Sequence, residues 1–108
     1  MAMAPELTQT ELEALFWQLA AQWHDETGMY SIARQKVGHP AYLRIIGLGP
    51  RTIPLILHDL AATSGWWFDA LKALTGVNPA AAIDQSKPIE MRQVWLEWAK
   101  SEGIAFDP

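Results

Sequence analysis

The sequence contains no cysteine, which excludes disulfide bonds, thiolate metal ligands and a cysteine nucleophile, and is compatible with a reducing compartment. It also contains no apolar run approaching the ~18 residues of a membrane-spanning helix. The beginning of the chain, MAMAPELTQTE, lacks the basic segment and apolar run of a signal peptide. We therefore expect a cytoplasmic protein with no membrane partner.

Recognisable motifs for catalysis, phosphate binding or cofactor binding are also missing. The serines have no neighbouring base, and in the stretch 47–50, GLGP, a proline stands where a phosphate cradle would need an N–H group. His24-Asp25-Glu26 and His58-Asp59 are runs of adjacent residues, whose side chains diverge on a helix and cannot converge on one metal. We expect His58 and Asp59 to form a solvated pair on the polar face of their helix. The sequence thus predicts no enzyme, no metal and no cofactor.

What the sequence does contain is enough apolar material for one folded domain. Half of its 108 residues are apolar, and six are tryptophan. A chain of this size buries about two thirds of the surface that its unfolded form exposes. Each fully buried aromatic side chain contributes at most ~4 to 6 kcal/mol at ~25 cal/mol per Å². We expect a single domain over residues 1–108, with residues 1–7 as a tail and the tryptophans dominating the core.

Capping residues and apolar periodicity predict an all-α fold. Thr8 and Glu11 fit a capping box, Gly76 fits a left-handed helix stop, and Pro54 inside a helical pattern predicts a kink or a late helix start. The segment 29–39 has weak periodicity and is consistent with a short helix or a turn. The expected helices cover residues 8–27, 40–46, 51–62, 66–75 and 88–102, and Ser64 is the expected N-cap of the fourth. The predicted fold is a compact bundle of about five helices around a central hairpin.

That hairpin, within residues 45–76, carries a resemblance to a known family. The piece GLGPRTIPLILHDL followed by SGWWFDALKALTG, residues 47–60 and 64–76, resembles one unit of a HEAT-type helical repeat. HEAT-type units stack into protein-binding solenoids, but the chain has no second copy and stable arrays need about three repeats. The resemblance therefore implies a hairpin architecture. Residues 42–76 also resemble a small uncharacterised bacterial protein family sharing Y, IIG, PLIL and TG landmarks, which implies no activity.

Three aromatic residues exceed what the predicted helical stripes accommodate. Trp17 points about 130° away from the main apolar stripe of the first helix. Trp66 and Phe68 flank the Trp67 stripe, and cannot both share its centre. One alternative is that neighbouring helices or the 28–40 loop bury all three side chains. The other is that Trp17, Trp66 and Phe68 form contacts with another protein or in a homodimer, where aromatic residues are enriched.

Four cations form a local positive stretch in an otherwise acidic chain of net charge −4. They are Arg34, Lys36, Arg44 and Arg51, and no acidic residue lies between Glu26 and Asp59. Four phosphate contacts would give a salt slope of only about −3.6. The helix WWFDALKAL, residues 66–74, also lacks Arg, Asn or Gln to hydrogen-bond base edges. These four cations have two interpretations. They form a solvated face or a docking site for an acidic protein segment, or they bind an anion or a nucleic acid.

These observations favour a small non-enzymatic protein-interaction or regulatory module, for example the antitoxin or immunity-like partner of a co-encoded protein. The alternative is an accessory nucleic-acid-binding protein that uses the 34–51 basic stretch. An enzyme would require a pocket in which His24, His39 or His58 meets a carboxylate.

Overall fold

Six α-helices and one 3₁₀-helix form the part of the chain that the computed structural model describes, residues 7–28, 33–63 and 65–106. No strand occurs in these ranges, so the predicted all-α class is confirmed. The elements are α1 (Gln9–Thr27), α2 (Ala33–Val37), α3 (Pro40–Gly47), η1 (Pro50–Thr52), α4 (Ile53–Thr63), α5 (Phe68–Thr75) and α6 (Pro88–Ser101).

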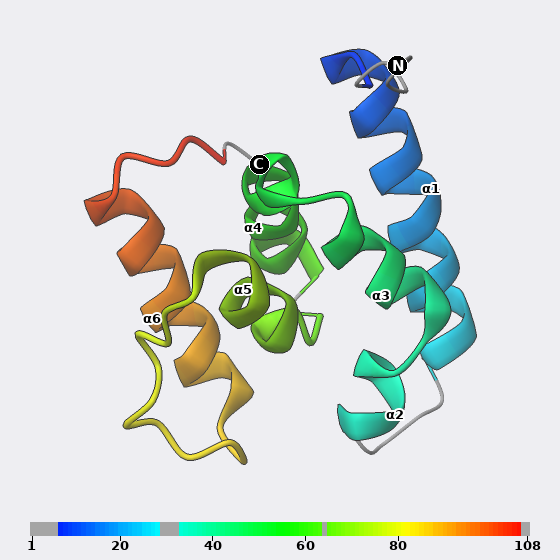
Figure 1. Cartoon of the computed structure of the whole chain (residues 1–108). Helices are drawn as coiled ribbons and strands as arrows, with labels where there is room; N and C mark the ends of the chain where they lie inside the picture. The colour runs from blue at the N-terminus through cyan, green and yellow to red at the C-terminus, as the bar shows by residue number, and fades with distance from the viewer. Residues whose placement is uncertain (1–6, 29–32, 64, 107–108) are drawn as a thin grey trace.

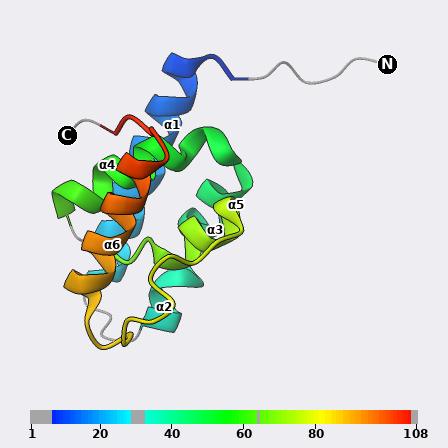
Figure 2. The same cartoon turned by 90° about the vertical axis from the view of Figure 1, so that its left-hand side faces the viewer.

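Helix α1 lies on one side of the molecule and α6 on the other, with α4 and α5 between them (Figure 1). The most extensive packing between two elements is that of α3 on α1. Helix α5 packs on α3, and α4 packs on α6. Helices α4 and α5 contact each other less than α5 contacts α3. The two helices of the predicted central hairpin, α4 and α5, therefore pack mainly on different neighbours, α6 and α3. Figure 2 shows α6 crossing in front of α1 and α4.

The predicted helix boundaries rest on observed caps. Thr8 Oγ1 accepts the Glu11 N–H at 3.1 Å, and Glu11 Oε1 accepts the Thr8 N–H at 2.9 Å, which completes the predicted capping box. Pro40 is the first residue of α3. Gly76 ends α5 with φ 74°, the left-handed conformation that glycine adopts without steric cost. The late helix start at Pro54 is confirmed, because η1 precedes it and leaves Pro54 in the first turn of α4.

Helix α5 begins at Phe68, two residues later than predicted. Trp66 and Trp67 precede the helix, and the Trp67 N–H donates to the Gly65 carbonyl at 2.9 Å in a turn. The reason lies in tertiary contacts, because in this turn both indole N–H groups reach a carboxylate. Ser64, the predicted cap of this helix, lies outside the described residues.

The core is centred on Trp67, which is fully buried. Its ring stacks with that of Tyr42 at 5.4 Å and with that of Phe16 at 5.8 Å, and meets the ring of Trp23 at 4.5 Å. Such aromatic pairs stabilise a fold by about 0.5 to 1.5 kcal/mol beyond the burial of their surface. Segments from α1, α3 and the turn before α5 are thereby joined in one cluster.

Helix α6 is attached to α4 through an arginine and returns the chain over the core. Arg92 donates from Nε to the Leu60 carbonyl at 3.0 Å and from Nη2 to the Ala61 carbonyl at 2.6 Å, near the end of α4. After α6, Ile104 and Phe106 are partly buried against the core. The preceding connection, residues 76–87, forms successive turns rather than a helix.

Candidate functional site

A carboxylate buried between three segments is the first polar constellation in the structure. Asp59 is 6% exposed, and its Oδ2 accepts hydrogen bonds from His24 Nε2 at 2.6 Å, Trp67 Nε1 at 2.8 Å and Thr63 Oγ1 at 3.3 Å. The prediction that Asp59 is a solvated residue is therefore wrong. Position 59 is only ~60° around the helix from Ile56, at the edge of the apolar stripe. Its helical position therefore already indicated that Asp59 lies close to the core.

The same contacts determine the charge state of Asp59. Burial alone would raise the pKa of its carboxyl, but the hydrogen bonds from His24 and Trp67 and the charge of His24 outweigh burial and hold the pKa below its usual range. Asp59 is thus the ionised acceptor of a structural network. Neither His24 nor Asp59 lines the hollows described below.

A second histidine, His39, acts as a helix cap. Its Nδ1 accepts the Ala41 N–H at 3.0 Å, which assigns the ring proton to Nε2, and Nε2 lies 2.8 Å from Glu26 Oε1. His39 thereby connects the beginning of α3 to α1. Both of these histidine–carboxylate contacts, His24–Asp59 and His39–Glu26, connect one helix to another.

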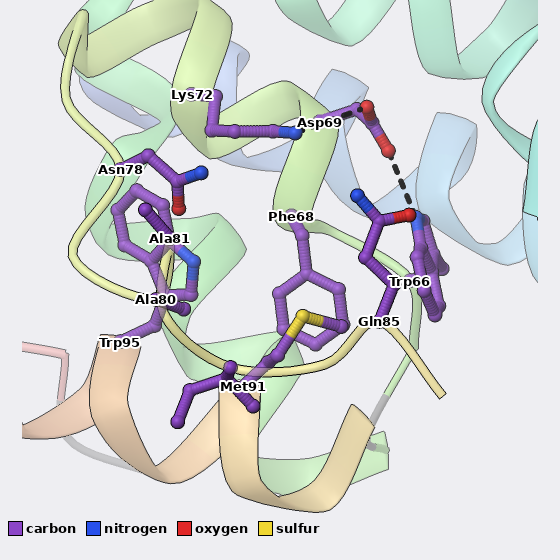
Figure 3. A pocket seen from close by; sticks show the side chains of 11 residues that line it. Trp66, Phe68, Asp69, Lys72, Asn78, Ala80, Ala81, Gln85, Met91 and Trp95 are labelled. Atoms are coloured by element: carbon purple, nitrogen blue, oxygen red, sulfur yellow. Dashed lines mark hydrogen bonds and ion pairs between the residues drawn. The ribbon is translucent and has the colours of Figure 1, made fainter. Parts of the chain in front are cut away.

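Trp66 and Phe68 line a small hollow of about 60 Å³ between α5, the 76–87 connection and α6. Figure 3 shows Phe68 beside Met91, and Trp66 at one side of the hollow, where its Nε1 donates to Asp69 Oδ2. Phe68 is only 4% exposed, which corrects the expectation that it lies on a contact surface. Trp66 is partly buried, and its indole N–H is hydrogen-bonded to Asp69. Neither residue forms a protruding patch.

Trp17 lies in a different and wider hollow, which we call the Trp17 groove. Trp17 is 37% exposed, and its ring meets the His58 ring edge-on at 5.4 Å and the core ring of Phe16 at 4.9 Å. The groove measures about 530 Å³ and is lined by Glu13, Trp17, Pro54, Leu55, His58, Ala105 and Phe106. It thus lies between α1, the first half of α4 and the C-terminal segment. Trp17 combines the two predicted alternatives, because it packs on a neighbouring helix and remains partly exposed.

Of the groove residues, the sequence singled out only Trp17 as a contact. Glu13 lies four residues before Trp17 and therefore on the same face of α1, so this neighbour was readable from helical spacing. No local sequence pattern indicates that Leu55 and Phe106 lie beside Trp17.

The four predicted anion contacts come from three elements, α2, α3 and η1. Arg51 Nη1 donates to the Leu7 carbonyl at 2.7 Å and Nη2 to Gln9 Oε1 at 3.3 Å, at the N-terminal end of α1. The Lys36 carbonyl instead accepts the Trp23 indole N–H at 2.8 Å, about 21 Å further along α1. Arg44 is exposed on α3, and the side chain of Arg34 lies outside the described residues.

Metal and membrane features are not found in the described ranges. Among those residues, no three His, Asp or Glu side chains gather as a metal site would require. Every helix in the same part of the chain is too short or too polar to cross a membrane. Comparisons with protein-family models, curated proteins and solved structures found no match.

Proposed function

We propose that this protein works by binding another protein, and that the Trp17 groove is the contact surface. The observation that carries the proposal is a tryptophan held by α1 and α4 at the wall of a groove of about 530 Å³ and 37% exposed there. Tryptophan is enriched among the few residues that dominate binding energy, because it combines a large apolar area with few rotatable bonds. The groove is also lined by the apolar residues Pro54, Leu55 and Phe106.

The rigidity of the groove supports the same function. Trp17 is held edge-on by Phe16 of the core and by His58 of α4. A side chain already held in place loses less conformational entropy on binding than a mobile one. An antitoxin or immunity-like partnership with a co-encoded protein is one form that such binding would take.

Nucleic-acid binding is less well supported as the function. Arg51 is engaged with Leu7 and Gln9, and Lys36 lies at the other end of α1. Cations so dispersed would neutralise phosphates singly, which gives weak and strongly salt-dependent association.

Selection from a displayed library of random 12-residue peptides tests the proposal. We expect peptides that bind the wild-type chain and fail to bind Trp17→Ala. Ile89→Ala is the matched control, because Ile89 is an apolar residue of α6 that is 71% exposed and outside the groove. Sedimentation equilibrium with the same variants tests a second copy as the partner. A strictly monomeric chain with no Trp17-dependent peptide would overturn the proposal.

A further inference from the structure

The titratable side chains that line the Trp17 groove are one carboxylate, Glu13, and one imidazole, His58. Its described lining contains neither Lys nor Arg. The chain as a whole carries a net charge of −4. A cationic partner group is therefore favoured by the local charge and by the long-range potential that steers encounter.

Glu13 has unused capacity to accept hydrogen bonds. Its Oε2 accepts one from Gln9 Nε2 at 2.9 Å, whereas a carboxylate offers about four acceptor positions. Among the described residues Glu13 takes part in no ion pair. Arg51 of η1 lies near this end of α1, but its guanidinium donates to Leu7 and Gln9 and not to Glu13.

Trp17 lies one helical turn beyond Glu13 on the same face of α1, and both residues line the groove. An indole attracts a cation placed within ~6 Å of its ring centre, and a guanidinium is the group most often found there. A guanidinium also pairs with a carboxylate through two parallel N–H bonds, which a lysine ammonium cannot do. The adjoining Pro54, Leu55 and Phe106 suit an apolar residue next to that arginine.

We propose that the occupant of the Trp17 groove is a protein segment carrying an arginine beside an apolar residue, with the guanidinium between Trp17 and Glu13. The inference rests on the proposed function and names the chemistry of its partner.

The test uses the strongest Trp17-dependent peptide from the displayed library, resynthesised with citrulline in place of arginine. Citrulline keeps the shape of the side chain and removes its charge. We expect arginine in the selected peptides, a loss of about tenfold in affinity on its replacement, and a loss of similar size for Glu13→Gln binding the arginine peptide. Glu13→Gln should bind the two peptides within about twofold of each other, because the paired charge is already gone.

The outcomes separate the inference from the function beneath it. Trp17-dependent peptides without arginine, or an equal affinity of the arginine and citrulline peptides for the wild type, would overturn the inference and leave protein binding in place. A Trp17-dependent homodimer without peptide binding would also overturn it, with a second copy as the occupant. If no peptide depends on Trp17 and the chain stays monomeric, the proposed function fails, and the inference fails with it.

Discussion

The indole N–H of Trp67 donates to Oδ2 of Asp59 across 2.8 Å, and both residues are buried. The same oxygen also accepts from His24 on α1. One carboxylate of α4 therefore connects the longest helix to the tryptophan at the centre of the core. Buried polar groups that are fully hydrogen-bonded hold segments in one arrangement, since any rearrangement would leave a donor without an acceptor.

Removal of this carboxylate should strongly destabilise the fold. Asp59→Ala leaves the Trp67 indole N–H buried without its acceptor, and we expect the free energy of unfolding to fall by about 2 to 4 kcal/mol. Urea denaturation followed by circular dichroism measures the change. Asp25→Asn, at an exposed position of α1, should stay within about 0.5 kcal/mol of the wild type. A loss below about 1 kcal/mol for Asp59→Ala would show that the network contributes little.

Two glycines provide a matched test of packing before α5. A Cβ added at Gly65 would lie 2.8 Å from His24 Cε1 and 3.2 Å from Trp23 Cζ3, whereas one added at Gly47 would meet nothing within 4 Å. We expect Gly65→Ala to cost about 1 to 3 kcal/mol and to disturb the His24–Asp59 contact. Gly47→Ala, at the last residue of α3, should be neutral or stabilise by up to ~1 kcal/mol. Thermal melts of the two variants measure these changes in stability. Equal changes for Gly65→Ala and Gly47→Ala would contradict the close approach of His24 and Trp23 to Gly65.

Local signals predicted the helices well, because capping and helix termination depend on residues adjacent in sequence. The Thr8–Glu11 capping box and the Gly76 stop are examples. The start of α5 was misplaced because the turn at Trp66 and Trp67 depends on Asp59 and Asp69 as partners. Asp59 is eight residues from Trp67, and the helical pattern does not report such a contact.

The candidate site was only partly predictable for the same reason. The projection of Trp17 away from the main stripe was readable from the 3.6-residue period. The groove itself requires α4 and Phe106 to come beside α1, which joins positions about 40 and 90 residues apart in the chain. The same holds for the basic stretch, because Arg51 meets the N-terminal end of α1 whereas the Lys36 carbonyl meets Trp23 toward the C-terminal end.

The difference between core and groove tryptophans predicts unequal costs of truncation. Trp67 is fully buried and Trp17 is 37% exposed. Trp67→Ala should cost about 4 kcal/mol or more, combining lost transfer free energy with a cavity, and should leave Asp59 short of a donor. Trp17→Ala should cost only about 1 to 2 kcal/mol, because part of its surface is already in water. Chemical denaturation of both variants measures this, and a Trp17→Ala chain that fails to fold would place Trp17 in the core.

Stability should also fall in acid through Asp59. Its folded pKa is lowered by His24, Trp67 and Thr63, whereas in the unfolded chain the carboxyl returns to about 3.9. The unfolded state therefore binds the proton more readily, so the stabilisation is complete above the unfolded pKa and is lost as the pH falls through the folded pKa. We expect the stability advantage of wild type over Asp59→Asn to begin to narrow as the pH falls toward the unfolded pKa of about 3.9, and to be lost as the pH falls through the lower folded pKa.

Urea denaturation at a series of pH values makes this comparison, with Asp84→Asn as the control. The pKa of Asp84 is also lowered, by hydrogen bonds from Ser86, but Asp84 is exposed and solvent screens its contribution. Asp84→Asn should therefore follow the wild-type acid transition closely. A constant difference between wild type and Asp59→Asn from neutral pH into acid would mean that the Asp59 charge does not stabilise the fold, and that its hydrogen bonds alone hold the core together.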